Sequence, residues 1–498
     1  MSIFEKLSEM RDAGGIRVTD GLSDQIIRQF SAQDPKLSSA VDQAYEIFID
    51  LKQEFPEILA LDEIDQVVAM HAEIINFYTD DVVNPYVSLA ASGPWLITSK
   101  GAVIYDTGGY GMLGFGHAPE SVLEAMSHPH VMANIMTANF SQLRLSNALR
   151  KEIGNEPHTC PYDGFLCLNT GSEAVSLGAR ISDINAKLAT EAGGPYAGKK
   201  IKHIALRGGF HGRTDRPAHY SDSTRPVYLK YLASFQGDDT LLTVEPNNLK
   251  QLQQVFSKAI ADGYFIESMF MEPVMGEGNP GAPITREFYD LARKLTAEHG
   301  ALLLVDSIQA GLRAHGCLSI VDYPGFEGIE APDMESFSKA LNAGQYPLSV
   351  LAVTERGTEL YQKGVYGNTM TANPRALDVA CQVLSQFTPE LRQNIRVKGR
   401  EFVTKLQQLA AEMPSLITGV QGTGLLVSCE LGPDFKSYGY DSIEEYMRSK
   451  GIGVIHGGKN SLRFTPHFNV TSDELDLIVE ATGHALLQGP RQQQTKVA

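Results

Sequence analysis

The residue types most able to do chemistry in this chain fall in five short segments, most of which contain or follow a short apolar run. The segments are NTGSEAV (169–175), RGGFHGRT (207–214), MEPVMGEGNPG (271–281), LLLVDSIQAG (302–311) and PDMESFSKALNAGQYPL (332–348). The short apolar runs are typical of buried β-strands, and open α/β sheets bind ligands at the carboxyl ends of their strands. The sequence therefore predicts that these segments meet in one site.

The first two segments carry a candidate phosphate site and an aromatic side chain. Gly171 permits a tight turn, and Ser172 opens a predicted helix whose free N–H groups would hold a phosphate. A Ser in this place is equally typical of an ordinary helix N-cap. The second segment presents an aromatic ring, an imidazole and a guanidinium close together, from Phe210, His211 and Arg213.

The other three segments supply carboxylates and one amine. Glu272 and Glu277 lie in a glycine-rich loop, and Asp306 ends an apolar strand, so it is expected to be buried and to need a partner. Lys339 lies in a serine-flanked segment before another glycine-containing loop. A phosphate cradle, a stacking ring, a carboxylate for a pyridinium nitrogen and a lysine for an imine are together what pyridoxal 5′-phosphate requires.

A second motif competes with this interpretation. Gly109, Gly111 and Gly114 fit the pattern G-x-G-x-x-G, and AVIYD before them could be a strand. Dinucleotide binding also needs an acidic residue about 20 positions on, to hold a ribose hydroxyl. The stretch HVMANIMTANF (130–140) has none, so a close-packed turn is the favoured interpretation.

The elements that must position these residues change character along the chain. Strand and helix patterns alternate in the central part, which indicates a mostly parallel sheet covered by helices, followed by a smaller α+β domain. The expected fold class is therefore α/β. The expected divisions are a helical N-terminal region or arm (1–95), a large cofactor-binding domain (96–370), a small domain (371–486) and a polar tail (487–498).

Composition excludes several classes of protein. The 498 residues carry a net charge of −17, which argues against nucleic acid or an anionic membrane as the main partner. The five cysteines are scattered without a C-x-x-C pair, so neither a disulfide framework nor a zinc site is expected, and no metal is predicted. The absence of a signal-peptide pattern or long apolar run completes the expectation of a soluble, cytoplasmic protein.

From about residue 95 to residue 485 these motifs resemble the class III aminotransferases of the fold-type I family, the group that acts on ornithine, acetylornithine, 4-aminobutyrate and the lysine ε-amine. The most specific part of the resemblance is the block from Asp306 and Gln309 to Lys339. The resemblance implies a seven-stranded type of sheet, a smaller second domain and a homodimer with shared active sites, or a higher oligomer built from such dimers.

The resemblance also implies a role for each cofactor residue. Lys339 is expected to form the Schiff base, and Asp306 is expected to pair with the pyridine nitrogen. The remaining cofactor-binding residues are expected to be Gly171 and Ser172 at the phosphate, Phe210 and Ile308 on the two faces of the ring, Gln309 at the phenolic oxygen, His211 and Glu272 close by, and Thr369 at the neighbouring subunit's phosphate.

Two arginines are expected to bind substrate carboxylates through bidentate hydrogen bonds. Arg463 matches the arginine that grips the α-carboxylate of glutamate, and Arg213 matches the one that holds a distal carboxylate. Glu277 matches the carboxylate that pairs with the first arginine while an ω-amine donor is bound.

Three departures from the usual pattern of the group lie near the predicted pocket. Ser307 replaces a glutamate, Arg313-Ala-His315 replaces Gly-Arg-Thr, and Met275 replaces a glutamine. They leave the exact substrate open.

The predicted reaction is transfer of an ω-amino group, from ornithine, lysine or a related amino acid, to 2-oxoglutarate, which yields a semialdehyde and glutamate. Within the fold, the alternatives are an amine or β-amino-acid transaminase that uses pyruvate, a decarboxylase, or an aminomutase. A catalytically silent dimer and an NAD-binding oxidoreductase are alternatives of other classes.

Overall fold

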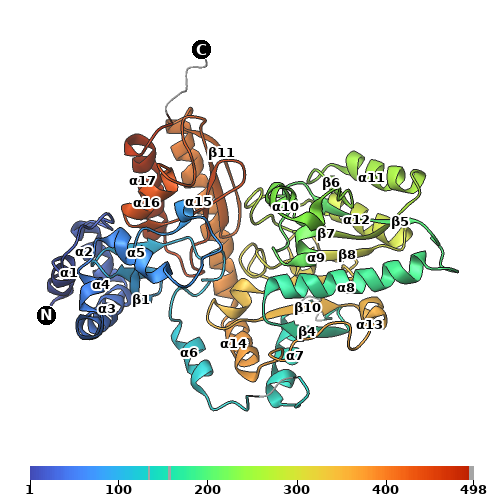
Figure 1. Ribbon diagram of the computed structural model, residues 1–498, viewed down its shortest axis with the longest axis horizontal. Helices are drawn as coiled ribbons and strands as arrows, with labels where there is room; N and C mark the ends of the chain where they lie inside the picture. The colour runs from blue at the N-terminus through green and yellow to red at the C-terminus, as the bar shows by residue number, and fades with distance from the viewer. Residues whose placement is uncertain (133–134, 155–158, 493–498) are drawn as a thin grey trace. The chain divides into compact units, whose positions relative to one another are not determined.

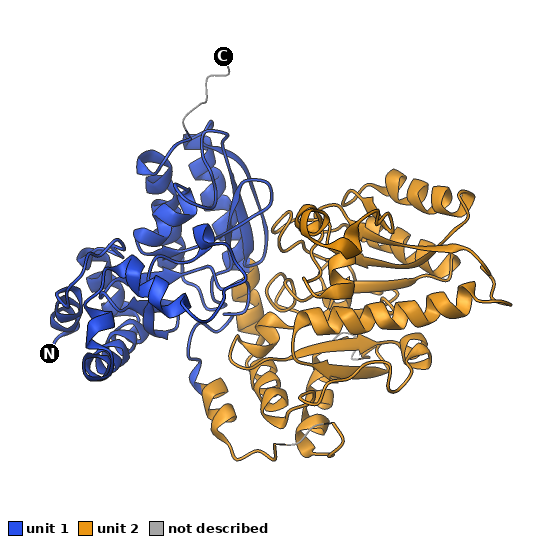
Figure 2. Cartoon of the chain, in the orientation of Figure 1, with its two compact units in different colours: residues 1–120, 397–498 blue, residues 121–396 orange. Residues whose placement is uncertain are grey.

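The computed structural model describes residues 1–132, 135–154 and 159–492. The chain forms two compact units, one of residues 1–120 and 397–498 and the other of residues 121–396 (Figure 2). The first unit therefore combines both ends of the chain. The predicted domain boundaries at residues 95 and 370 are not tested by this division, and they remain predictions. The last part of the predicted tail, residues 493–498, lies outside the described residues.

Unit 121–396 is built on a sheet that has seven strands in the described part of the chain. Their order is β4 (Gly164–Leu168), β10 (Ser349–Val353), β9 (Met334–Phe337), β8 (Leu302–Asp306), β7 (Tyr264–Met271), β5 (Lys200–Leu206) and β6 (Leu241–Val244). All neighbours pair in parallel except β10, which is antiparallel to both β4 and β9. The predicted mostly parallel sheet is confirmed.

Helices cover this sheet (Figure 1). The long helix α8 (Gly171–Thr190) packs along β4, β10, β9, β8 and β7, and Gly178 lets it approach closely, because a Cβ there would lie 2.3 Å from Leu304. Fully buried apolar residues from α8 and the strands form the core between them. The other α-helices of this unit are α6 (Glu120–Ser127), which begins at the unit boundary, α7 (Phe140–Glu152), α9 (Asp215–Tyr220), α10 (Arg225–Tyr231), α11 (Leu249–Ala261), α12 (Arg286–Glu298), α13 (Glu355–Leu360) and α14 (Pro374–Ser385).

The other unit begins with the helices that the periodicity of the N-terminal residues predicts. They are α1 (Ile3–Arg11), α2 (Asp24–Gln33), α3 (Pro35–Glu54), α4 (Pro56–Leu59) and α5 (Glu63–His71). Apolar residues recur at helical spacing over residues 63–78, but α5 ends at His71. Helix α3 packs on a small sheet of order β1 (Ser88–Ser92), β2 (Trp95–Thr98), β3 (Val103–Asp106) and β13 (Ile452–Gly453).

Parallel pairing of β13 with β3 explains why the two ends of the chain share a unit. A second small sheet has the order β11 (Ile417–Thr423), β12 (Leu426–Leu431), β15 (Ser461–Phe464) and β14 (Ile455–Gly457). Its helices are α15 (Pro389–Glu412), α16 (Ile443–Ser449) and α17 (Ser472–Gln488), of which α15 extends across the boundary at residue 396.

A buried lysine attaches the N-terminal helices to the first small sheet. Lys100 is 1% exposed, and its ammonium donates to the carbonyl oxygens of Gly14, Leu59 and Leu61 at 2.5, 2.8 and 2.7 Å. These distances match charge-assisted hydrogen bonds. The ammonium thus holds two chain segments at one point, the one after α1 and the one between α4 and α5.

The glycine motif at 109–114 forms a close-packed turn rather than a dinucleotide site. No helix follows it directly, and a Cβ at Gly114 would lie 2.2 Å from the ring of Phe468. Close packing therefore accounts for this glycine. Among the described residues no helix is long and apolar enough to cross a membrane, and no cluster of three or more candidate metal ligands occurs.

Candidate active site

The carboxyl ends of β4, β5, β7, β8 and β9 lead directly into the five segments that the sequence singles out. Because these strands run in parallel, their ends lie along the same edge of the sheet. Asp306 and Ser336 are register partners on β8 and β9, and Lys339 follows β9 at the start of the 3₁₀ helix η4 (Lys339–Asn342). The edge therefore carries most of the predicted site.

Asp306 is 3% exposed and held from three directions. Its Oδ2 lies 2.8 Å from His211 Nδ1, and its Oδ1 accepts from Ser336 Oγ at 3.0 Å and from the Ile308 backbone N–H at 3.2 Å. These contacts satisfy the hydrogen-bonding needs of a buried carboxylate. Nε2 of His211 is buried and has no hydrogen-bond partner in the described part of the chain.

Lys339 has a backbone conformation that is unusual for its type. Its φ is +46°, in the left-handed region where side chains other than glycine are strained. Strained residues persist where the surrounding structure fixes them, and they cluster at active sites. The side chain is half-buried, and its ammonium donates to Oε1 of Gln309.

The candidate phosphate cradle lies at the start of α8. Thr170 is the N-cap and the helix begins at Gly171, one residue before the predicted start at Ser172. A Cβ on Gly212 would lie 2.4 Å from the Ser172 hydroxyl, and one on Gly171 would lie 2.7 Å from Ile308. The glycines thus bring Ser172, the 207–214 loop and Ile308 together.

Glu272 joins two of the loops. One oxygen accepts from the Phe210 N–H at 3.0 Å, and the other accepts from the Gly276 N–H at 2.8 Å. The side chain is 3% exposed, and burial raises its pKa to about 7, against the opposing effect of His211. The structure therefore shows Glu272 as a link between loops 207–214 and 271–281.

The predicted substrate residues are distributed over both units. Arg213 is exposed, with its guanidinium 5.7 Å from the Phe210 ring centroid, and Glu277 is half-buried. Arg463 belongs to the other unit, where it lies on β15 and is 4% exposed. Its pairing with Glu277 stays a prediction.

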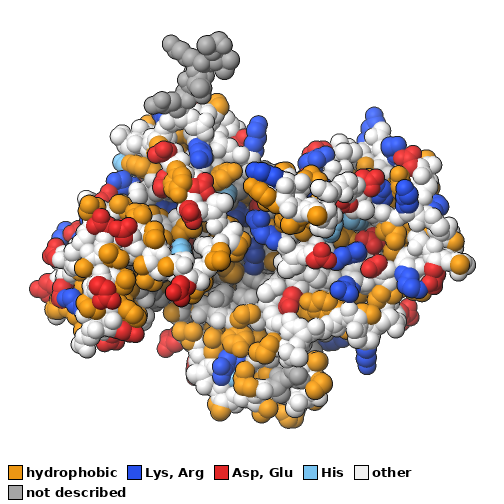
Figure 3. All heavy atoms as spheres, in the orientation of Figure 1, with side chains coloured by type: hydrophobic (Ala, Val, Ile, Leu, Met, Phe, Trp, Pro, Cys, Tyr) orange, Lys and Arg blue, Asp and Glu red, His pale blue; other side chains and the backbone are white. Residues whose placement is uncertain are grey.

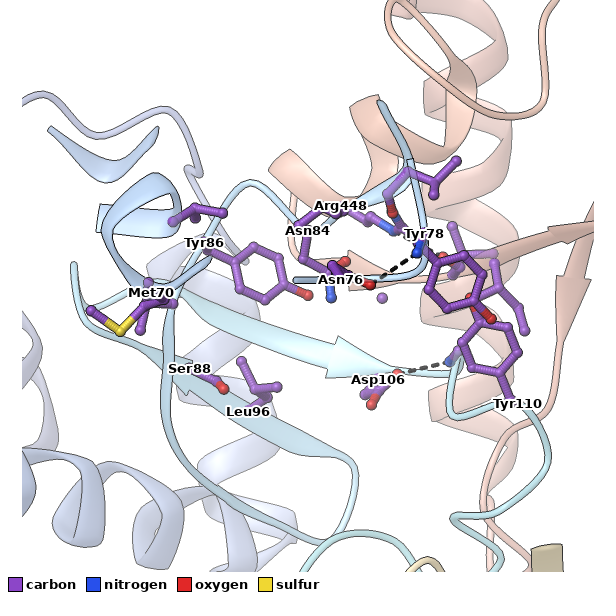
Figure 4. A pocket seen from close by; sticks show the side chains of 18 of the residues that line it. Met70, Asn76, Tyr78, Asn84, Tyr86, Ser88, Leu96, Asp106, Tyr110 and Arg448 are labelled. Carbon is purple, nitrogen blue, oxygen red and sulfur yellow. Dashed lines mark hydrogen bonds between the residues drawn. The ribbon is translucent and has the colours of Figure 1, made fainter. Parts of the chain in front are cut away.

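Arg463 has an aromatic neighbour that the sequence reasoning missed. The Tyr110 ring centroid lies 5.5 Å from its guanidinium, within the range of a cation–π contact. Tyr110 also lines a cavity of about 450 Å³, whose wall includes Tyr78, Tyr86, Asp106 and Arg448 (Figure 4). A positive φ at Tyr110 is the strained feature of the turn, and nothing in the sequence signals it.

Thr369 is exposed and lines a different cavity, of about 750 Å³, in unit 121–396. Beside it, Asn368 Nδ2 donates to Glu173 Oε1 on the first turn of α8 at 2.6 Å. The segment around Thr369 is thus held at the cradle helix of its own chain. Its predicted reach to a neighbouring subunit stays a prediction.

Two of the departures from the usual pattern have buried surroundings. Ser307 donates to the buried carboxylate of Glu335, on the next strand, at 2.5 Å. Arg313 is fully buried, and burial lowers its pKa to about 9. Both Glu335 and Ser336 were missed by sequence reasoning, although the strand alternation around Asp306 and Lys339 could have pointed to them.

Comparisons with known proteins place the chain in a family. The family pattern of class-III aminotransferases matches residues 78–486, and the chain belongs to this family. The acetylornithine aminotransferase of Thermosynechococcus vestitus is 27% identical over 78% of this chain and 92% of its own length. That of Clostridium acetobutylicum is 31% identical over 63% of this chain and 74% of its own length.

Solved structures match the fold. The ornithine aminotransferase of Toxoplasma gondii has a TM-score of 0.72 and 21% identity, and the match covers 88% of this chain and 98% of that one. A transaminase from the marine bacterium Virgibacillus has a TM-score of 0.69 and 16% identity, with coverage of 85% and 98%. At these identities the structures establish the α/β fold with its smaller domain.

Class-III aminotransferases use pyridoxal 5′-phosphate, so the predicted cofactor is confirmed. The residues present fit this group. Gln309 Nε2 is buried at the edge of the site without a hydrogen-bond partner among the described residues, and Gly212 lets the 207–214 loop approach the Ser172 hydroxyl on the first turn of α8. The Asp306 carboxyl group and the Lys339 amine complete the set of polar groups.

Proposed function

We propose that this aminotransferase transfers the ω-amino group of ornithine, lysine or a related ω-amino acid to 2-oxoglutarate, giving a semialdehyde and glutamate. The observation that carries the chemistry is the placement of Asp306, anchored by His211 and Ser336, one strand away from Lys339. The relatives named acetylornithine and ornithine aminotransferase support an ω-amino donor.

In this proposal each residue at the edge of the sheet has a separate role. The bound cofactor supplies an electron sink for the carbon that bears the amine. Lys339 would hold the cofactor covalently at rest, and its amine would act as the base only when it is free of that bond. Its contact with Gln309 positions the amine. Asp306, as an anion, keeps the ring nitrogen protonated. Phe210 and Ile308 hold the two ring faces, and Gly171 and Ser172 bind the phosphate.

The substrate carboxylates are assigned to guanidinium groups. We assign the α-carboxylate of glutamate to Arg463, whose burial at 4% exposure strengthens an interaction with an anion. We assign a distal carboxylate to Arg213, and a masking role toward Arg463 to Glu277. Tyr110, at 5.5 Å from Arg463, restricts the orientations available to that guanidinium.

The proposed assembly is a homodimer in which Thr369 reaches the neighbouring subunit's phosphate. A group of exposed apolar side chains supports it, and hydrophobic surface is visible over the segment between α6 and α7 (Figure 3). The group consists of Val131, Met132, Ile135, Met136, Phe140 and Leu143. Ile135, Met136 and Thr369 line the same cavity, and apolar patches of this kind mark interfaces.

The dimer has a direct test. Thr369→Ala should loosen the cofactor, and dilution below the dimer dissociation constant should have the same effect. Sedimentation measures the assembly, and cofactor titration measures the affinity. Unchanged cofactor affinity in a confirmed monomer would exclude the shared site.

The reaction is tested with a panel of donors, namely ornithine, N-acetylornithine, lysine, 4-aminobutyrate, a β-amino acid and a simple amine. Each is assayed with 2-oxoglutarate and with pyruvate as acceptor. The proposal predicts the highest kcat/KM for an ω-amino acid with 2-oxoglutarate, and release of a semialdehyde. Preference for pyruvate with a simple amine would replace it by the amine transaminase alternative. The cytoplasmic location remains a prediction from the sequence.

A further inference from the structure

The strand that precedes Lys339 carries a buried carboxylate that the proposed reaction does not use. Glu335 is fully buried, and its register partner on β8 is Val305, next to Asp306. Among the described residues no lysine, arginine or histidine forms an ion pair with it. A buried carboxylate without a cation is costly unless hydrogen bonds satisfy both of its oxygens.

Four donors satisfy Glu335. Oε1 accepts from Ser307 Oγ at 2.5 Å and from the Ile320 N–H at 2.9 Å. Oε2 accepts from Ser319 Oγ at 2.5 Å and from Tyr162 Oη at 2.6 Å. Burial raises the pKa of Glu335 to about 7, and the four donors oppose that effect.

Three of these donors belong to one segment, and they lie at its two ends. Ser307 begins the connection after β8, while Ser319 and Ile320 end it at the 3₁₀ helix η3 (Ile320–Asp322). Between the two ends lie Ile308, which contacts the Gly171 turn, and Gln309, which accepts from Lys339. One carboxylate thus closes the loop that carries both cofactor-facing side chains.

The neighbouring residue on the same strand completes the arrangement. Ser336 Oγ donates to Asp306, and its carbonyl accepts from the Ser307 N–H at 3.0 Å. Consecutive residues of β9 therefore hold consecutive residues of the active-site segment. We propose that Glu335 is a positioning residue of the active site, which sets Ile308 and Gln309 against the cofactor by holding both ends of loop 307–320.

This inference rests on the proposed contacts of Ile308 and Gln309 with pyridoxal phosphate, and does not depend on the identity of the amino donor. The fourth donor provides a matched control. Tyr162 also bonds to Glu335, but it precedes β4 and lies outside the loop. Tyr162→Phe and Ser307→Ala each remove one hydroxyl from the same buried carboxylate.

The test compares Ser307→Ala, Ser319→Ala and Tyr162→Phe. The melting temperature of the apoprotein should fall in all three, because each loses a buried hydrogen bond to a carboxylate. The dissociation constant of pyridoxal phosphate should rise about five- to twentyfold for the two serine variants, with a shifted cofactor absorbance band, and change less than about twofold for Tyr162→Phe.

Substitutions at Glu335 itself supply a rescue arm. Glu335→Gln should retain most of the cofactor affinity, because its amide oxygen still accepts from the loop and the Ser319 and Tyr162 hydroxyls can turn to accept from its NH₂ group. Glu335→Met should lose it. If Glu335→Met does not fold, the serine and tyrosine variants decide alone.

Equal changes in cofactor affinity for Ser307→Ala and Tyr162→Phe, or no change in either, would show that Glu335 is only structural. Failure of the proposed function is measured separately, on the unsubstituted protein, as cofactor attachment at a lysine other than Lys339. The two failures are therefore distinguishable.

Discussion

Nδ1 of His211 lies 2.8 Å from Oδ2 of Asp306, and both side chains are buried at the edge of the central sheet. Because Asp306 can only accept in its ionised form, the imidazole donates this hydrogen bond. The Ser221 hydroxyl accepts from the His211 backbone N–H at 2.9 Å, which fixes the loop that presents the ring. The imidazole thus orients the carboxylate that the reaction requires as an anion.

Asp306→Asn should keep the cofactor attached but slow proton removal from the substrate by several orders of magnitude, since a neutral pyridine is a poor electron sink. Single-turnover absorbance kinetics measure this step. The matched control is Asp333→Asn, because Asp333 is also buried at 1% exposure but pairs with Arg293 at 2.8 Å, away from the predicted site residues. Near-normal rates for Asp306→Asn would show that its carboxylate is only a satisfied buried group.

Glu272 should make the stability of the apoprotein depend on pH. Its pKa is about 7 in the folded protein because of burial, against an ordinary value of 4.5. The folded state therefore holds the proton more tightly than the unfolded state. The corresponding stability is fully present below about pH 4.5 and is lost as the pH rises through about 7.

Glu272→Gln should remove this dependence. Between about pH 5.5 and 8, the free energy of unfolding of the unsubstituted apoprotein should fall by up to about 2 kcal/mol relative to the variant. Denaturant unfolding at several pH values measures it. Parallel profiles for the two proteins would mean that Glu272 stays ionised throughout this range.

Lys100→Met should detach the N-terminal helices, because it leaves three carbonyl oxygens without their ammonium donor. We expect a loss on the order of 3–5 kcal/mol, as for removal of one partner of a buried charged network. The control is Lys450→Met, which removes an exposed ion pair with Asp20 and should cost less than about 1 kcal/mol. Limited proteolysis measures the detachment as faster cleavage of the chain before β1 in Lys100→Met. Equal resistance of Lys100→Met and Lys450→Met to the protease would contradict the prediction.

Glu277→Ala should separate the two half-reactions. If Glu277 masks Arg463 while an ω-amino donor is bound, its removal slows the donor half-reaction and leaves the glutamate half-reaction unchanged or faster. A charge-assisted pair is worth about 1.5–3 kcal/mol, so the ratio of the two rates should shift about ten- to hundredfold. Arg463→Ala should instead impair mainly the 2-oxoglutarate half. If Glu277→Ala changes the rates of both half-reactions by the same factor, Glu277 does not mask Arg463.

The sequence predicts the central fold and the edge of the sheet well, because short apolar runs before Gly171, Glu272 and Asp306 mark strands and their carboxyl ends. It predicts less where contacts come from distant segments. The four donors to Glu335 come from three places in the chain, and no local pattern relates them.

The grouping of residues 1–120 with residues 397–498 could not be predicted for the same reason. It depends on two register pairs between β3 and β13, which are more than 300 residues apart, and periodicity cannot reveal such pairing. Helix α5 ends at His71, before the helical pattern of apolar residues does, for a different reason. Apolar residues continue to Phe77 at helical spacing, yet Ile74, Ile75 and Phe77 are exposed, so burial does not support a longer helix.

The central claim is that Lys339 carries the cofactor, and peptide mapping after borohydride reduction tests it most directly. Reduction of the protein with bound pyridoxal phosphate should leave one pyridoxyl label, on the peptide that contains Lys339, and Lys339→Ala should fold normally but carry no label. A label on any other lysine, or an unlabelled protein with full aminotransferase activity, would contradict the account.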